Sequence, residues 1–445
     1  DALFAFAGER TEDHVVLERA PLIARHFWPD GATLDLWDDP ERSAEAVRAF
    51  GGAGAEADFR AFSARAKRLH DAFEEPVMMS AAPSLPQLVG HVLRRPRLIA
   101  DMGVGTLAQS LGRQFRDPRL AQLFGRYATY VGGTPFRSPG VLGLIWHAEA
   151  SGVWRVRGGM HRLAEALAAL AESRGAEFRF ETGVARIEVQ DGRPVCVWLE
   201  DGTRLPADHV VYNGDPKALA EGRLGAAARR AVPRSGVAPR SLSAHVQAFA
   251  AAAEGPELAY HNVFFAADPM AEFGPIHEGR MPVDPTIYVC AEDRGNGPPA
   301  PGTLERFETI MNAPPTGATE QSEEEIARCL ERAHATLARC GLSFHPRPGP
   351  ATLTTQAGFH RLFPASDGSL YGRSPHGLTA AFARPTARTS QPGLVLCGGG
   401  VHPGAGVPMA TLSGRHAAAT ILSGRTSISP SRPTATPGGM STASP

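Results

Sequence analysis

An apolar run, three glycines and a helical pattern follow one another near the end of the chain. Leu394 to Cys397 form a short apolar run that fits a buried strand. Glycines follow at 398–400, where the backbone turns sharply or lets another group approach closely. Pro408 suits the first turn of a helix, because its missing N–H needs no partner there. The pattern predicts a strand, a glycine loop and a helix whose free N-terminal N–H groups suit a flat or anionic ligand.

Helical spacing dominates the first third of the chain, after a short hairpin. Residues 27–31 indicate a turn between two strands. From about 40 to 135, apolar residues recur at helical spacing with charged residues between them. The stretch from Leu85 to Met102 sets apolar positions against three arginines. Such a basic amphipathic segment suits a membrane interface, and it also suits a core helix with a solvated face.

Strand patterns dominate the middle of the chain. A helix is expected before Gly175, and Phe178 and Phe180 mark a strand after it. Further strands are predicted at 184–189, 195–199, 209–212, 244–249, 261–265 and 286–290. A helix follows at 323–340. The tail, 425–445, is rich in Ser, Thr and Pro, and we expect it to be disordered.

Composition narrows the class of protein. The chain has 445 residues, enough for two or three domains, with 43% hydrophobic and 20% charged residues. Its 45 basic and 46 acidic residues leave no overall field that would favour a nucleic-acid partner. Five scattered cysteines favour a reducing compartment and show no zinc spacing, so no metal site is expected. No apolar run reaches the roughly 18 residues of a spanning helix, so we expect a cytoplasmic, peripherally membrane-associated protein.

Residues 397–415, C-G-G-G-V-H-P-G-A-G-V-P-M-A-T-L-S-G-R, resemble the C-terminal flavin motif of the bacterial carotenoid desaturase (phytoene desaturase) family. The ending M-A-T-L-S-G-R is most similar to the branch that desaturates 1-hydroxycarotenoids of the hydroxyneurosporene type. The block at 126–149 also resembles the family, and it suits either the wall of an apolar tunnel or a helix core. The resemblance implies that FAD is the cofactor and that the backbone of Val184 pairs with its adenine. It places the flavin ring against Gly398, Gly399, Gly400, His402, Pro403, Gly404, Gly406, Val407, Pro408 and Met409.

The resemblance also implies the fold. We expect an α/β protein with a glutathione-reductase-like, Rossmann-type FAD-binding domain, a mixed-sheet substrate domain and a helical, membrane-facing region. The expected parts are substrate-domain strands at 1–39, a helical substrate and membrane region at 40–150, part of the FAD-binding domain at 151–216, the substrate domain at 217–387, and the FAD-binding strand, loop and helix at 388–424. The G-x-G-x-x-G fingerprint of such domains does not occur in this sequence, so we expect that about 65 residues of the family's N-terminal segment are missing.

Acid–base candidates come from one predicted helix. Carotenoid desaturases have an Asp and an Arg three residues apart that are proposed to lie near the polyene, but Gly90 and Leu93 stand at those positions here. His91 and Arg94 keep this spacing one position along and share a helix face. They are the catalytic candidates, and an ordinary surface pair is the alternative interpretation.

The resemblance implies an FAD-dependent enzyme that introduces a carbon–carbon double bond into a linear carotenoid. The sharpest form of this hypothesis is 3,4-desaturation of a 1-hydroxycarotenoid. Membrane lipid would be a peripheral partner, and a quinone or oxygen the electron acceptor. Alternatives within the family are phytoene desaturation, isomerisation and methyl-group oxidation. A non-catalytic carotenoid-binding protein and a soluble amine or sugar oxidase are the alternatives from other classes.

Overall fold

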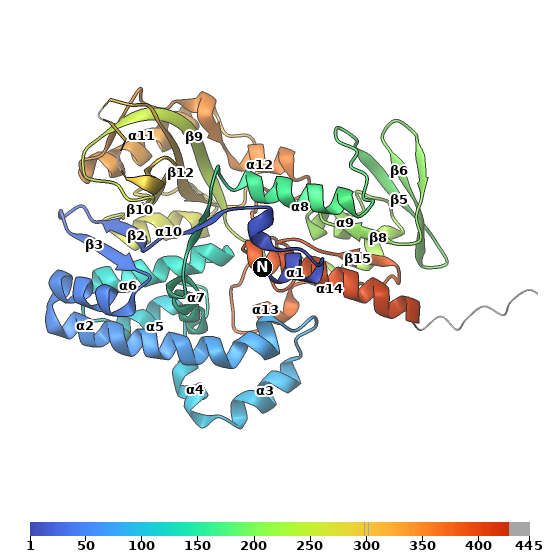
Figure 1. The fold of residues 1–445 in the computed structure, drawn as a ribbon, viewed down its shortest axis with the longest axis horizontal. Coiled ribbons are helices and arrows are strands. Elements are labelled where there is room, and N and C mark those ends of the chain that lie inside the picture. Colours follow the sequence, from blue (N-terminus) through green and yellow to red (C-terminus); the bar gives the residue numbers. More distant parts are fainter. Residues whose placement is uncertain (298, 301, 427–445) are drawn as a thin grey trace, which may run out of the picture.

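A mixed sheet forms one end of the molecule in the computed structural model, which describes residues 1–297, 299–300 and 302–426 (Figure 1). The described strands follow the order β13-β9-β12-β11-β10-β2-β3, and β14 pairs with β9. β10 and β2 are parallel, and the other neighbours are antiparallel. The strands are β2 (Leu22–Phe27), β3 (Thr33–Trp37), β9 (Ser243–Glu254), β10 (His261–Phe264), β11 (Ile287–Ala291), β12 (Glu305–Ala313), β13 (Ser343–His345) and β14 (Leu353–Thr354).

The two faces of this sheet have different surroundings, a packed core on one side and a cavity on the other. Successive side chains on a strand point to opposite sides, so each strand contributes to both faces. On β12, Phe307 and Met311 pack in a core that also contains Leu337 of helix α11 (Glu323–Arg339). The alternate residues Glu308 and Ile310 line a cavity on the opposite face. One face of the sheet therefore holds the fold together, and the other faces the interior space of the protein.

Helices fill the region below the sheet. Aromatic side chains of the long helix α2 and of α6 pack together, with ring centroids of Phe62 and Phe124 4.6 Å apart. The segment predicted as one amphipathic unit forms two helices, because the residue before Pro96 is disfavoured in helical conformation. The helices are α2 (Pro40–Phe73), α3 (Leu85–Leu93), α4 (Pro96–Met102), α5 (Leu107–Gln114), α6 (Pro118–Gly125) and α7 (Ile145–Ala150).

A third region carries the glycine loop. Strand β15 pairs in parallel with β8, and the loop leads from β15 into helix α14. A three-stranded antiparallel sheet, β5-β6-β7, projects beside it at the upper right of Figure 1. The elements are α8 (His161–Ser173), β5 (Val184–Gln190), β6 (Arg193–Leu199), β7 (Arg204–Pro206), β8 (Val210–Tyr212), α9 (Pro216–Glu221), α13 (Ala380–Ala383), β15 (Leu394–Leu396) and α14 (Val407–Thr426).

Short elements complete the fold. Strands β1 (Leu17–Arg19) and β4 (Trp154–Val156) pair with each other, so β1 does not belong to the large sheet, although 1–39 was expected to supply substrate-domain strands. Helix α1 (Ala2–Phe6) precedes them, while α10 (Pro269–His277) and α12 (Gln356–Leu362) lie near the large sheet. No described helix is both long and apolar enough to cross a bilayer.

Most of the predicted elements are confirmed, with two corrections. Phe178 and Phe180 do not form a strand; no described strand pairs with them, and the residues are 43% and 80% exposed. A strand without a neighbour leaves its backbone groups unpaired, so the apolar pattern alone does not suffice. The disordered tail was predicted to begin at residue 425, but Arg425 and Thr426 belong to α14. The rest of the predicted tail, 427–445, lies outside the described residues.

Candidate functional site

The glycine loop and the large sheet border one cavity of about 700 Å³. Gly399, Gly406 and Val407 form its wall on the side of the loop and the start of α14. Residues of β2, β9, β10, β11 and β12 line it from the sheet, and Tyr130 and Glu149 line it from the helical region. All three regions of the fold therefore meet at this cavity.

The three consecutive glycines of the loop have different surroundings. Gly398 and Gly400 are closely packed, whereas Gly399 faces open space. Gly398 has a φ of +103°, and a Cβ there would stand 2.3 Å from Oδ1 of Asn213. A Cβ on Gly400 would lie 2.9 Å from Pro216. A Cβ on Gly399 would meet no atom within 4 Å, although this residue lines the cavity. The backbone at Gly399 is thus a bare surface that a flat molecule can approach.

Helix α14 begins at the cavity wall. Its first residue is Val407, and Pro408 occupies the first turn as predicted. The N–H groups of Val407 and Met409 donate no hydrogen bond within the described part of the chain. Unpaired N–H groups and the positive end of the helix dipole favour an electron-rich ligand here.

Arg384 holds the backbone of the glycine loop in place through hydrogen bonds to carbonyl oxygens. Its guanidinium, 9% exposed, donates to the carbonyl oxygens of Tyr371 (2.7 Å), Gly399 (2.9 Å) and Arg373 (2.8 Å). Burial, together with the charges of Arg240 and Arg373, lowers the pKa of Arg384 to about 10, so the side chain stays charged at neutral pH. No carboxylate of the described residues forms an ion pair with it, so its charge adds to the positive potential at the loop.

A polar network covers the helical wall of the cavity. Arg126 donates to the hydroxyl of Tyr130 (2.7 Å), which donates to Glu149 (3.0 Å). The hydroxyl of Tyr127 also donates to Glu149. Burial raises the pKa of both tyrosines, which keeps them protonated donors. Tyr127 packs in the helix core, while Arg126, Tyr130 and Glu149 reach the cavity. The block at 126–149 therefore contributes both to a helix core and to a cavity wall, the two interpretations that its sequence allowed.

The sheet contributes a second set of polar groups. Nδ1 of His261 and the hydroxyl of Tyr288 are 2.6 Å apart and share a hydrogen bond. Burial and the charges of Arg126 and Arg155 lower the pKa of His261 to about 4, so the imidazole is neutral at physiological pH. The strand β12, which the sequence analysis missed, adds Glu308 and Asn312. The available signal was weak, since only Phe307 and Met311 mark one apolar face and the apolar Ile310 lies on the other.

Comparison with known proteins now decides the family. Residues 104–422 match the family of flavin containing amine oxidoreductases. The hydroxyneurosporene desaturase of Cereibacter sphaeroides is 54% identical over 423 residues, which cover 95% of this chain and 85% of that protein. The protein of the same name from Rhodobacter capsulatus is 49% identical over 428 residues, covering 96% and 86%. The chain belongs to the carotenoid desaturase family.

As a member of this family, the protein is an FAD-dependent oxidoreductase. A solved structure of a putrescine oxidase with redesigned cofactor binding has a TM-score of 0.51 and 13% identity, and it covers 95% of this chain and 85% of that one. At this identity the similarity concerns the fold alone. It agrees with the expected α/β flavoprotein fold and its mixed sheet.

Four other residues predicted for the site do not line this cavity: His402, Pro403, Gly404 and Val184. His402 is buried, and its Nε2 is 2.9 Å from the carbonyl oxygen of Ser80, so its ring packs behind the loop. Pro403 and Gly404 lie in the same loop, and a Cβ on Gly404 would face Arg384 at 3.6 Å. Val184 begins β5, and it is not among the residues that line this cavity.

His91 and Arg94 are not brought to the cavity. They lie on and just after α3, at the lower edge of Figure 1, and neither lines the cavity at the glycine loop. His91 contacts Arg95, with Nδ1 2.9 Å from Nη1, and Arg94 is exposed. This geometry matches the alternative interpretation of a surface pair and gives the catalytic hypothesis no support.

A group of potential metal ligands lies elsewhere. His70, Asp71 and His147 place ligand atoms within 4.8 Å of one another, although no metal site was expected from the sequence. Lys67 pairs with Asp71 at 2.9 Å and already neutralises the one carboxylate. The group does not line the cavity and takes no part in the site.

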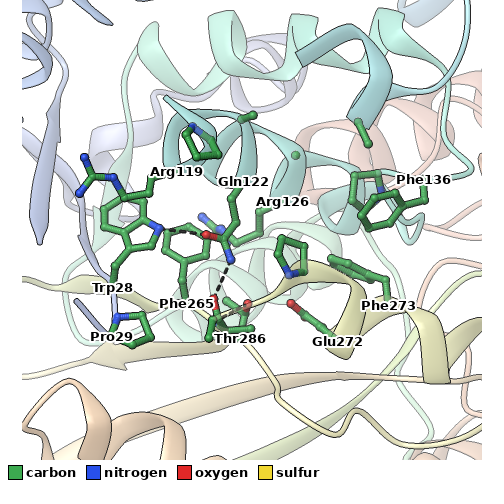
Figure 2. A pocket seen from close by; sticks show the side chains of 18 of the residues that line it. Trp28, Pro29, Arg119, Gln122, Arg126, Phe136, Phe265, Glu272, Phe273 and Thr286 are labelled. Atoms are coloured by element: carbon green, nitrogen blue, oxygen red, sulfur yellow. Dashed lines mark hydrogen bonds between the residues drawn. The ribbon is translucent and has the colours of Figure 1, made fainter. Parts of the chain in front are cut away.

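A second cavity, of about 450 Å³, adjoins the first, since Arg126 and Thr286 line both. Figure 2 shows its mainly apolar wall, which includes Trp28, Phe265 and Phe273. Nε1 of Trp28 donates to Gln122 at 3.0 Å, a hydrogen bond drawn in Figure 2. The two cavities are thus neighbours, one with a polar wall and the other with an aromatic wall.

Glu272 is a buried carboxyl group at the second cavity. It is 2% exposed, and Asn312 donates a hydrogen bond to it at 2.8 Å. Burial raises the pKa of Glu272 from 4.5 to about 7. The folded protein therefore holds this proton in a pH range in which the unfolded chain releases it.

Glu272→Gln should flatten the pH dependence of stability. Below pH 4.5 both states are protonated and the carboxyl carries no penalty; between 4.5 and 7 the free energy of unfolding of the wild type falls as pH rises. The full loss above pH 7 is about 3 kcal/mol. Urea unfolding at pH 5 and pH 8 should show most of this difference in the wild type and little in the variant. Glu278→Gln, at an exposed position after α10, is the control. Equal slopes for E272Q and the wild type would contradict the prediction.

Proposed function

We propose that this protein desaturates a linear carotenoid bearing a hydroxyl group at C1, introducing a double bond between C3 and C4. One observation carries the proposal: the bare glycine loop and the start of α14 share a cavity with the large mixed sheet. The similarity to two hydroxyneurosporene desaturases supports the substrate and the reaction.

The residues around the loop are proposed to hold the cofactor. Gly399 leaves room for a flat ring, and the free N–H groups of Val407 and Met409 suit its electron-rich edge. Gly398, Gly400, Gly404 and Gly406 shape the loop, and we propose that His402, Pro403 and Pro408 fix its course. Val184 is proposed to contact the adenine through its backbone. When bound, FAD accepts the two electrons and one of the two protons that the substrate loses, and a quinone or oxygen is the proposed acceptor that reoxidises it.

The protein itself orients the substrate and excludes water. The apolar wall of the second cavity suits part of a polyene, since burying apolar surface stabilises a bound hydrocarbon. Holding the reacting carbons in one orientation accounts for much of the rate that an enzyme can supply.

The test of the proposal is conversion of a defined carotenoid. Protein with bound FAD is mixed with liposomes that contain hydroxyneurosporene, and the pigments are separated by mass and absorption. A product two hydrogens lighter, with a longer chromophore, is expected. Unchanged hydroxyneurosporene together with consumption of phytoene would overturn the proposal in favour of phytoene desaturation. Colourless protein that still binds carotenoid would overturn it in favour of a binding protein.

We also propose a peripheral membrane location on the cytoplasmic side, through α3 and α4. Val89, Leu93 and Ile99 expose 48%, 65% and 50% of their surface, while Leu88 and Val92 pack against the protein. Arg94, Arg95 and Arg97 beside them are exposed. Apolar side chains flanked by arginines suit a membrane with anionic head groups, from which a carotenoid enters.

Leu93→Asp should weaken binding to liposomes with anionic lipid by about tenfold, because an inserted leucine contributes about 1.5–3 kcal/mol. Co-sedimentation with liposomes measures the change. Leu362→Asp is the matched control, since Leu362 is 66% exposed on α12, far from α3 in Figure 1. Equal loss in both variants would contradict the proposed membrane face.

A further inference from the structure

Glu308 and Tyr371 are polar residues at the cavity whose side chains lack partners in the described part of the protein, as does Oγ of Ser243 beside them. Tyr130 is paired with Arg126 and Glu149, and Tyr288 with His261. In contrast, neither the Glu308 carboxyl nor the Tyr371 hydroxyl forms a hydrogen bond or ion pair within the described residues. Both residues are half-buried, and such polar groups lose free energy when a bound ligand removes them from water without bonding to them. A ligand that forms hydrogen bonds with both Glu308 and Tyr371 would supply the partners that they lack.

The fold places these two groups near the glycine loop. Glu308 faces the cavity because the alternation of β12 turns Phe307 and Thr309 to the other side. Tyr371 is tied to the loop, since Arg384 donates to the carbonyl oxygens of both Tyr371 and Gly399. Burial and the nearby charge of Glu308 raise the pKa of Tyr371, which keeps its hydroxyl protonated.

The pair has the chemistry that recognises an alcohol. A carboxylate accepts a hydrogen bond, and a phenol donates one, while an alcohol does both. The residues beside them in the cavity, among them Val246, Ile310 and Leu370, are apolar and suit hydrocarbon around that alcohol. An anionic ligand is less suited, because the Glu308 carboxylate repels negative charge.

We propose that Glu308 and Tyr371 form a hydroxyl subsite that binds the C1 alcohol of the carotenoid and thereby places C3 and C4 at the glycine loop. This inference rests on the proposed function. Only three bonds separate the hydroxyl oxygen from C3, so the subsite has to lie close to the flavin-facing wall. Glu308, Tyr371 and Gly399 line the same cavity, and Arg384 joins the backbone carbonyls of Tyr371 and Gly399, in agreement with this requirement.

The subsite makes the enzyme selective for hydroxylated substrates. A carotenoid without the alcohol leaves both groups buried and unpaired, and sites built to bond a hydroxyl reject analogues that lack it. We expect the wild type to prefer hydroxyneurosporene over neurosporene by at least about 100-fold in kcat/KM. Glu308→Leu keeps the volume but removes the acceptor.

The experiment compares three variants on the two carotenoids in liposomes. Glu308→Leu should reduce the preference to within about fivefold and raise turnover of neurosporene, because the unpaired carboxyl no longer opposes its binding. Glu308→Gln, which keeps an acceptor oxygen, should retain an intermediate preference. Tyr371→Phe should lower the preference about tenfold. Dissociation constants measured on enzyme with chemically reduced flavin, which cannot turn over, should show the same order.

Controls separate the subsite from the proposed function. Glu254→Gln removes a carboxylate from the exposed end of β9 and should leave the preference unchanged. Wild-type preference retained in both Glu308→Leu and Tyr371→Phe would overturn the subsite while the desaturase function stands. Wild-type enzyme that converts neither carotenoid would overturn the function. Should Glu308→Leu fail to fold, the Tyr371→Phe variant alone decides.

Discussion

Gly399→Phe is expected to weaken FAD binding at least about 100-fold while the protein remains folded. A Cβ at this position meets no atom within 4 Å, and its φ is not in the left-handed region, so a side chain is tolerated by the chain itself. Because Gly399 lines the cavity, we expect the phenyl ring to extend into it. It occupies the space proposed for the flavin ring. The measurement is the ratio of flavin absorbance to protein absorbance after purification and titration with FAD.

Gly414→Ala is the matched control for this variant. It changes another glycine with no atom within 4 Å of its Cβ, but inside α14 rather than at the cavity. This substitution should leave flavin content unchanged and stabilise the helix by up to about 1 kcal/mol. Full flavin content in Gly399→Phe would show that the ring does not lie against this wall.

Arg384→Leu should have the largest effect on stability, a loss of about 3–5 kcal/mol in the free energy of unfolding. The leucine leaves three buried carbonyl oxygens without the donor that now joins Tyr371, Arg373 and Gly399. Each unpaired carbonyl costs about 1–3 kcal/mol, although water can reach some of them. Urea unfolding at pH 7 measures the change. Flavin content should fall as well, because the same arginine fixes the backbone of the loop.

Arg388→Ala is the comparison, since Arg388 is exposed four residues further along and its side chain forms no hydrogen bond or ion pair in the described part of the chain. Its stability should stay within about 0.5 kcal/mol of the wild type. Arg384→Lys should recover little, because one ammonium group cannot match the fork of a guanidinium. A small effect of Arg384→Leu, similar to that of Arg388→Ala, would mean that the loop holds its shape without this contact.

Sequence patterns predicted correctly those helices, strands and loops whose type is set by residues close together in the chain. The apolar run at Leu394, the glycines after it and Pro408 predicted the strand, loop and helix that the structure contains. The hairpin around Trp28 and the helix at 323–340 were predicted in the same way. Strand β12 was not predicted, because its polar and apolar residues do not alternate regularly: Thr309 lies on the core face and Ile310 on the cavity face.

Candidate chemistry was harder to predict than structure. His91 and Arg94 were chosen by spacing along one helix, and the structure leaves them outside the cavity. Glu308, Tyr371 and Arg384 come from separate parts of the chain. A single Glu carries no pattern of its own, so the sequence did not single out Glu308.

The amino-acid sequence by itself determined the family, the cofactor class and the bare loop that meets it, because these depend on a contiguous motif whose backbone requirements are local. Only the tertiary structure decided which polar groups face one cavity and which of them are left without a partner. That outcome depends on pairing between strands far apart in the chain, such as β10 beside β2, and on burial, which no short stretch of sequence encodes.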